Sequence, residues 1–287
     1  MIITTGFAHR LLRVLAFSVF AAGSILAAGF PSHLLQKPDE WYATAEGKAT
    51  TARVLSWQTP SGSWPKAVNT AGKLNENAKK NVEGTFDNKS TTDELRYLAR
   101  AYRATQDEAC KQAYLRGLNL ILQAQYPNGG WPQSFPFSKK DYPRRITFND
   151  ESMIRLMQFL REVGEQNQAP WIGAERLQAV QQAVERGVEC ILRCQVVVKG
   201  VPTVWCAQHH EETLAPAAAR AYELPSLSGS ESAGILRFLM SLPHPSPRVR
   251  AAVTAGAAWF EAAKIKGIRV ESVKGDRQVI ELSLIHI

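Results

Sequence analysis

Two short motifs combine carboxylates with amides at positions where a helix is expected to begin. The first is Asp87-Asn88 and the second is Asn149-Asp150-Glu151. Carboxylate and amide oxygens suit a hard cation such as Ca²⁺, although neither motif has the spacing of an EF-hand loop. A calcium site would therefore have to be assembled from loops that lie far apart in the sequence. Helix N-capping is the alternative, and it is the commoner role of Asp and Asn at such positions.

Basic residues stand just ahead of the second motif. An arginine binds a carboxylate through a rigid pair of parallel hydrogen bonds, so such a cluster suits an acidic ligand, while a solvated loop is the alternative. Another arginine, Arg220, lies shortly before a third expected helix start at 226–231, in register with the first two motifs. The cluster consists of Lys139, Lys140, Arg144 and Arg145.

Both motifs belong to a unit that recurs along the chain. A Gln-x-x-x-Gly-x-Trp turn occupies 58–64 and returns at 125–131, and a looser copy runs from Gln195 to Trp205. Each turn is followed by a polar loop and a helix, with roughly 65 to 70 residues per unit. Repetition at this scale predicts an all-α ring of stacked helical hairpins with a few short strands in the long loops. An open solenoid is the alternative.

Apolar residues with helical spacing indicate where the helices lie. A polar stretch from 69 to 84 interrupts them and is expected to be an exposed loop. The expected helices cover 41–55, 90–102, 107–125, 150–160, 175–194, 226–240 and 248–265.

The two close copies of the turn each present a tryptophan beside Gly and Pro. The flat faces of Trp64 and Trp131 could stack on sugar rings or cap the hydrophobic core, and core packing is the commoner role. Turns of this kind also join helices in terpene cyclase toroids, so the motif alone does not select a function.

The composition is that of an ordinary globular protein with a basic balance. The chain has 287 residues, 45% of them hydrophobic, and a net charge of +8. A basic protein favours anionic partners such as nucleic acid, an anionic membrane or an acidic polymer, but net charge alone is a weak indicator of function.

The first 28 residues have the features of a secretory signal peptide. Arg10 and Arg13 precede an apolar run from 14 to 26, and small residues follow at 27–29. The run is short for a membrane span, so cleavage near Ala28 or Gly29 is favoured over an N-terminal anchor. We therefore expect a secreted or periplasmic protein with no stable membrane association after cleavage.

Four cysteines are present, and export would permit disulfides. Cys190 and Cys194 stand one helical turn apart, a poor geometry for a mutual bond, while Cys206 could pair with either. Buried free thiols, including Cys110, are the alternative. Because there is no CxxC pair, a zinc site is not expected.

Four segments together carry a family resemblance. They are TFDN at 85–88, QYPNGGWPQ at 125–133, YPRRITFND at 142–150 and ARAYELPSLSGSES at 219–232. In this order they resemble the pectate lyases of polysaccharide lyase family 10, over about residues 40 to 265. The resemblance implies an (α/α)3 toroid that cleaves polygalacturonate, the de-esterified form of pectin, by Ca²⁺-dependent β-elimination.

The resemblance also implies roles for individual residues. Asp87 and Asp150 would hold calcium, and Arg220 would be the catalytic base. Because the ordinary pKa of arginine is above 12, such a base needs dense positive charge nearby, and an alkaline activity optimum is expected. The implied substrate-binding residues are Asn88, Trp131, Arg144, Arg145 and Tyr222.

The resemblance divides the chain into a signal peptide at 1–28, a catalytic domain at 29–270 and a tail at 271–287. Family members continue with further substrate-binding arginines, so the tail is expected to be truncated or foreign. We expect a monomer that binds pectin and no nucleic acid. The alternatives are a non-catalytic toroid that binds acidic glycans and a terpene-cyclase-like toroid, against which the absence of a DxDD motif counts.

Overall fold

The computed structural model describes residues 29–74, 77, 79, 83–165, 170–265, 269–272 and 280–283. The expected signal peptide at 1–28 lies outside the described residues, as does most of the tail after 272. Among the described residues, no helix combines the length and the apolar character needed to cross a bilayer.

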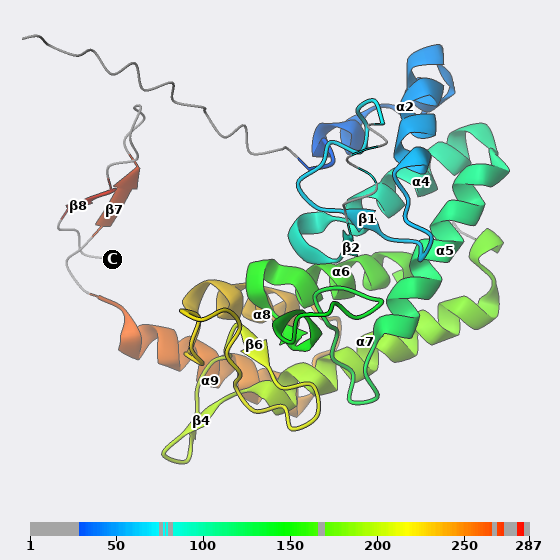
Figure 1. Ribbon diagram of the computed structural model, residues 1–287. Helices are drawn as coiled ribbons and strands as arrows, with labels where there is room; N and C mark the ends of the chain where they lie inside the picture. The colour runs from blue at the N-terminus through cyan, green and yellow to red at the C-terminus, as the bar shows by residue number, and fades with distance from the viewer. Residues whose placement is uncertain are drawn as a thin grey trace, which may run out of the picture.

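Helical hairpins form the body of the described chain (Figure 1). The hairpins α4–α5, α6–α7 and α8–α9 follow one another in an arc, with α1 and α2 packed at its beginning. The helices are α1 (Asp39–Ala43), α2 (Ala45–Ser56), α4 (Thr92–Thr105), α5 (Glu108–Ala124), α6 (Ser152–Glu165), α7 (Ala174–Cys194), α8 (Gly229–Met240) and α9 (Pro247–Ala263).

The remaining elements are short. The 3-10 turns are η1 (Ser32–Gln36), η2 (Asp87–Lys89), η3 (Tyr142–Arg144), η4 (Asn149–Glu151) and η5 (Pro170–Ile172). Antiparallel two-stranded pairs are formed by β1 (Trp64–Pro65) with β2 (Gly84–Thr85), β3 (Ile146–Thr147) with β6 (Gln208–His209), β4 (Val197–Val198) with β5 (Val201–Pro202), and β7 (Arg269–Ser272) with β8 (Ile280–Ser283).

The hairpins stack in two layers. The first helices α4, α6 and α8 contact one another in succession, and so do the second helices α5, α7 and α9. The prediction of an all-α (α/α)3 toroid with long loops and a few short strands is confirmed. The helices form because their apolar residues recur every three or four positions; α4, for example, buries Leu95, Leu98 and Tyr102 on one face.

One glutamine in each repeat joins successive hairpins. Gln58 Nε2 donates to the carbonyl of Gly62 in its own turn at 2.9 Å and to that of Ala113 in α5 at 2.8 Å. The equivalent distances are 3.0 and 2.8 Å for Gln125, which bonds Gly129 and Ala183, and 2.9 and 3.0 Å for Gln195, which bonds Thr203 and Ala252. Each turn is therefore bonded to the second helix of the following hairpin.

The glycine of each close turn copy is required by geometry. Gly129 has a φ of +94°, and a Cβ there would lie 2.0 Å from the carbonyl oxygen of Arg186 in α7. Gly62 has a φ of +110°, and its Cβ would lie 2.9 Å from the carbonyl oxygen of Arg116 in α5. Both glycines therefore permit a left-handed turn and a close approach between two repeats.

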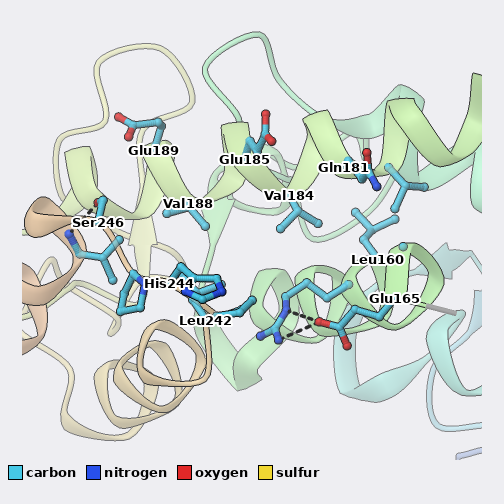
Figure 2. A pocket seen from close by; sticks show the side chains of 16 residues that line it. Leu160, Glu165, Gln181, Val184, Glu185, Val188, Glu189, Leu242, His244 and Ser246 are labelled. Carbon is cyan, nitrogen blue, oxygen red and sulfur yellow. Dashed lines mark hydrogen bonds and ion pairs between the residues drawn. The ribbon is translucent and has the colours of Figure 1, made fainter.

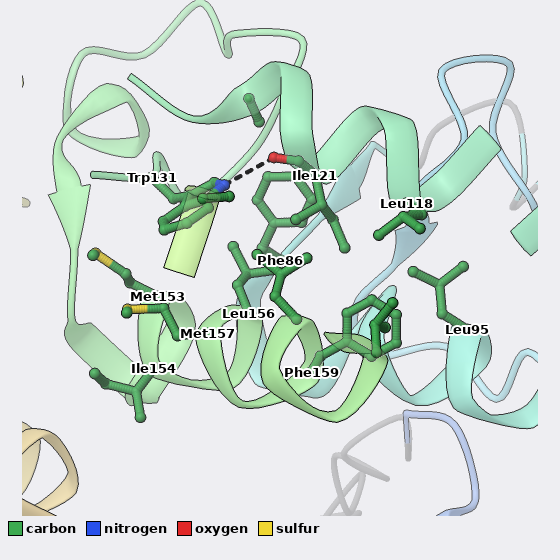
Figure 3. Close-up of a cluster of buried hydrophobic side chains, with 14 of the residues drawn as sticks. Phe86, Leu95, Leu118, Ile121, Trp131, Met153, Ile154, Leu156, Met157 and Phe159 are labelled. Carbon is green, nitrogen blue, oxygen red and sulfur yellow. Dashed lines mark hydrogen bonds between the residues drawn. The ribbon is translucent and has the colours of Figure 1, made fainter. Parts of the chain in front are cut away.

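The tryptophans of the turns belong to the core. The indole N–H groups donate to carbonyls of the preceding helix, from Trp64 to Val54 at 2.8 Å, from Trp131 to Ile121 at 2.8 Å, and from Trp205 to Ile191 at 2.7 Å. Figure 3 shows Trp131 packed beside Met153, Met157 and Phe86. Because Trp131 is fully buried, its prediction as a substrate contact is wrong, and the core alternative holds.

The four cysteines are free and buried, so the disulfide alternative is wrong as well. Cys190 Sγ and Cys194 Sγ lie 4.0 Å apart on α7, which is too far for a bond.

The glutamine bonds generate a stability prediction. Gln58→Leu keeps the bulk of the side chain but leaves the carbonyls of Gly62 and Ala113 without their donor. Since each buried unsatisfied group costs about 1 to 3 kcal/mol, we expect the two carbonyls to lower the free energy of unfolding by about 2 to 6 kcal/mol in urea titrations.

The control is Gln182→Leu, at an exposed position on α7. Equal urea midpoints for the two variants would contradict the structural role of the glutamine.

Candidate active site

The two acidic motifs form equivalent turns that pack against each other. They are η2 and η4, and each directly precedes the first helix of a hairpin. Asn88 and Asp150 both have left-handed backbone angles, with φ of 53° and 52°. These two residues are therefore structurally equivalent, and Asp87 corresponds to Asn149. Left-handed backbone at residues other than glycine is sparsely populated and clusters at functional sites.

Each turn is bound by the Trp turn of the next repeat. The backbone N–H of Phe86 donates to the carbonyl of Gln133 at 2.9 Å. In the same way the N–H groups of Phe148 and Asn149 both donate to the carbonyl of Ala207 at 2.9 Å. Gln133 and Ala207 each stand two positions after a core tryptophan, so the stacking of the repeats places the two motifs.

Asp87 is buried and only partly satisfied. Its carboxylate is 1% exposed, and Oδ2 accepts from Lys66 Nζ and from Gln133 Nε2, the latter at 2.9 Å. The other oxygen, Oδ1, is buried and has no hydrogen-bond partner. An ionised oxygen without a partner in the interior is costly, so this atom fits a cation ligand.

Asp150 and Asn88 present further oxygens from the same pair of turns. Asp150 is exposed, and its Oδ2 accepts from Asn149 Nδ2 at 2.8 Å. A hard cation takes six to eight oxygen ligands, and carboxylate and amide oxygens of this kind suit it. The described residues contain no group of three or more His, Cys, Asp or Glu side chains placed to hold a metal. A cation here would therefore need oxygens from backbone, water or substrate in addition.

A basic hollow of about 580 Å³ lies beside Asp87. Both side chains that contact the Asp87 carboxylate, Lys66 and Gln133, line this hollow, and so do Tyr142 and Glu83. Lys139 and Lys140 are exposed at its wall, where they make it positive. The hollow thus offers ammonium groups to an anionic ligand next to the buried carboxylate.

Sequence reasoning missed Lys66 and Gln133, although a signal was present. Both follow the tryptophan of a repeated turn by two positions, as Trp64-Pro65-Lys66 and Trp131-Pro132-Gln133. Aligning the repeats would have placed them together, because the turns are stacked in the same register.

The two arginines before Asp150 are held differently. Arg145 Nη1 donates to Glu211 Oε2 at 2.7 Å across the β3–β6 pair, and both side chains are largely buried. Burial opposes ionisation of Glu211, but bonds from backbone and from Arg145 hold its pKa below the ordinary value. Arg144 is exposed and lies over the ring of Phe137 at 5.3 Å. Arg144 is therefore available to a ligand, whereas Arg145 is already bonded to a carboxylate of the protein.

Arg220 lies in an exposed turn of the third repeat. Its Nε donates to both oxygens of Glu223 at 2.9 Å. This pair raises the pKa of Arg220, and the nearby Tyr142 and Asp150 act in the same direction. Arg220 therefore lies within electrostatic range of the second acidic motif. Tyr222 is 99% exposed on the same turn.

A second hollow, of about 530 Å³, shares no lining residue with the basic hollow (Figure 2). It is formed by the C-terminal half of α6, the middle of α7 and the loop between α8 and α9, with Val184, Val188 and Leu242 in its wall. Because α6 begins beside η4, this hollow is at the opposite end of the helices from the acidic motifs.

The first acidic motif is anchored by a buried glutamate. Glu94 Oε2 accepts from the backbone N–H of Thr91 at 2.8 Å and Oε1 accepts from Thr70 Oγ1 at 2.8 Å. Thr91 Oγ1 in turn accepts from the N–H of Trp64 and donates to the carbonyl of Thr85, both at 2.9 Å. Burial raises the pKa of Glu94 to about 7, although the bond from Thr70 opposes the shift.

Comparison with known proteins identifies what the chain resembles. The family model for pectic acid lyase matches residues 58–286. No curated protein matches the chain by sequence. Two solved structures of a family 10 polysaccharide lyase from Cellvibrio cellulosa share the fold, each with a TM-score of 0.68 and 32% identity, covering 84% of this chain and 75% of that one. One of the two is a mutant in complex with trigalacturonic acid.

The buried glutamate generates a prediction for the pH dependence of stability. The folded-state pKa of Glu94 is about 7, above the ordinary value of 4.5. Folded protein therefore keeps a proton that unfolded protein releases between these pH values, and stability falls as pH rises through the window. Glu94→Gln can satisfy Thr70 and Thr91 without ionising, so its stability relative to the parent should rise between pH 4.5 and 7.5.

Urea unfolding of both proteins at several pH values measures this difference. A difference that stays constant across the window would contradict the raised pKa of Glu94.

Proposed function

Because this chain belongs to the pectic acid lyase family and is a pectate lyase, we propose that it cleaves polygalacturonate by Ca²⁺-dependent β-elimination with Arg220 as the base. The observation that carries the proposal is the buried, half-satisfied carboxylate of Asp87 beside the basic hollow. Asp150 lies on the adjoining turn, and Arg220 is within electrostatic range of Asp150.

The proposed substrate is a polyanion, and the surface around the hollow suits it. Lys139 and Lys140 at the wall and Arg144 over Phe137 are exposed cations with different geometries. Lysine offers a point charge, whereas arginine offers a planar fork that fits a carboxylate. We assign Arg144 and Asn88 to substrate binding, with Tyr222 as a candidate stacking face. Arg145 remains a proposed uronate ligand only if its bond to Glu211 opens.

The reaction requires removal of the proton at C5 of a uronate. The C5–H electron pair forms the C4=C5 double bond while the C4–O bond to the neighbouring sugar breaks, and the departing oxygen takes up a proton. Calcium, held by Asp87 and Asp150, would supply positive charge that stabilises the developing negative charge on the uronate carboxylate. Arg144 can add a hydrogen-bonded charge at the same group.

Arg220 can act as a base only if its surroundings favour the neutral guanidine over the charged guanidinium. The Glu223 pair stabilises the charged guanidinium, which opposes proton abstraction. A neutral guanidine needs positive charge nearby and loss of the carboxylate partner. We therefore propose that the activity rises toward alkaline pH.

The proposal includes export of the chain. Residues 1–28 would be removed as a signal peptide, 29–270 would form the catalytic domain, and 271–287 a short tail. The mature protein would act as a secreted or periplasmic monomer. N-terminal sequencing of the exported protein tests the cleavage near Ala28.

A non-catalytic binder of acidic glycans is the second candidate, and the Arg220–Glu223 pair is the observation that favours it. Such a protein would bind polygalacturonate and release no product. Membership of the pectic acid lyase family removes the terpene-cyclase alternative.

Activity on polygalacturonate tests the proposed reaction. With polygalacturonate and Ca²⁺, the protein should release an unsaturated product that absorbs in the ultraviolet. Arg220→Ala should lower the rate about 10²- to 10⁴-fold, the usual contribution of a general base. The control is Arg250→Ala, at an exposed position on α9. A folded parent protein without ultraviolet product would refute the proposed reaction and support the binder.

The pH profile of the activity tests the proposed base. The Glu223 carboxylate raises the pKa of Arg220, so Glu223→Gln should lower it. If Arg220 is the base, the alkaline rise of kcat/KM, which reports the free enzyme, should then move toward lower pH. An unchanged profile in this variant, with activity retained, would exclude Arg220 as the titrating group.

A further inference from the structure

Lys66 holds a position that a bound cation would also need. Its Nζ forms an ion pair with Asp87 Oδ2, while Asp87 Oδ1 has no partner. The carboxylate is 1% exposed, whereas half of the Lys66 side chain is exposed in the basic hollow. The ammonium therefore lies at the boundary between the hollow and the buried carboxylate.

The backbone beside Lys66 is held firmly. Trp64 pairs with Thr85 in the β1–β2 ladder, and its N–H donates to Thr91 Oγ1 at 2.9 Å. The chain then turns at Ala67, where φ is +56°. Movement of the Lys66 ammonium therefore comes from rotation about its own side-chain bonds, for which the exposed hollow gives space.

A divalent cation that binds Asp87 would be repelled by the positive charge already there. Without a cation, Lys66 is the positive charge that compensates this buried carboxylate, because Gln133, the other partner of Oδ2, is neutral. A calcium ion on the same carboxylate would lie within a few ångströms of the ammonium and repel it strongly. We therefore expect that the Lys66 ammonium and a calcium ion cannot both bind Asp87 as tightly as either would alone.

We propose that Lys66 is a built-in competitor of calcium at Asp87, and that calcium binding moves its ammonium into the basic hollow. There it joins Lys139 and Lys140 as a partner for the carboxylate of the acidic sugar. This inference rests on the proposed function, since it takes Asp87 as a calcium ligand. Under this proposal, the binding of calcium also brings the Lys66 ammonium to the place where the acidic sugar binds.

The test is calorimetric titration with Ca²⁺ in the absence of substrate, at fixed pH and ionic strength. Lys66→Gln removes the competing charge and should bind Ca²⁺ roughly tenfold more tightly than the parent, as expected for loss of a close like charge. Lys66→Arg keeps the charge and should bind Ca²⁺ with nearly the parent affinity. Equal or weaker Ca²⁺ binding by Lys66→Gln would overturn the inference.

The matched control is Lys139→Gln, because Lys139 lines the same hollow and has no ion pair in the described part of the chain. Its Ca²⁺ affinity should stay within about twofold of the parent, since its charge is solvated. If Ca²⁺ affinity rose equally in Lys66→Gln and Lys139→Gln, the effect would come from net charge alone, and the specific role of Lys66 would be overturned.

Two further measurements separate this inference from the proposed function. Asp87→Asn should abolish the Ca²⁺ titration; if it does not, calcium binds elsewhere and both proposals fail. If Asp87→Asn abolishes binding but Lys66→Gln does not tighten it, only the competition fails. Thermal unfolding with and without Ca²⁺ gives an independent readout, because Lys66→Gln should show lower stability without Ca²⁺ and a larger gain on its addition than the parent.

Discussion

One side-chain amide determines how the repeats stack. The Nε2 group of Gln58, Gln125 or Gln195 donates to a carbonyl of its own turn and to a carbonyl in the second helix of the next hairpin. Because the two acceptors belong to successive repeats, the reach of one glutamine sets the distance between them. Each bond satisfies a buried carbonyl, so a slipped register would leave polar groups unpaired.

The site is a consequence of this stacking. The same register places Gln133 and Ala207, each two positions after a core tryptophan, against the acidic turn of the preceding repeat, whereas Lys66 reaches the acidic turn of its own repeat. The carbonyls of Gln133 and Ala207 bind the backbone of the two turns, and the side chains of Lys66 and Gln133 meet on Asp87. Three consecutive repeats therefore contribute to one face, which no single hairpin could build.

Particular residues show how far a sequence can be interpreted here. Asp87-Asn88 and Asn149-Asp150 look like the same motif with acid and amide exchanged, and both were correctly located at the starts of helices. Their left-handed residues nevertheless align Asn88 with Asp150, so one carboxylate is buried and the other exposed. The family resemblance implies that Trp131 and Arg145 bind substrate, yet Trp131 caps the core and Arg145 is bonded to Glu211. Residue type predicts which contacts a side chain can make but not which of them the fold uses.

The sequence by itself determined the helices, the period of the repeat and the family, because these depend on local spacing and on motifs that follow each other along the chain. Tertiary structure alone decided the partners of the charged groups. Lys66 meets Asp87 across 21 residues, and Arg145 meets Glu211 across 66. Such partners depend on which loops the stacked hairpins bring together. The charge environment of Asp87 follows from that proximity, because a buried carboxylate needs a compensating positive charge and Lys66 is the cation that lies beside it.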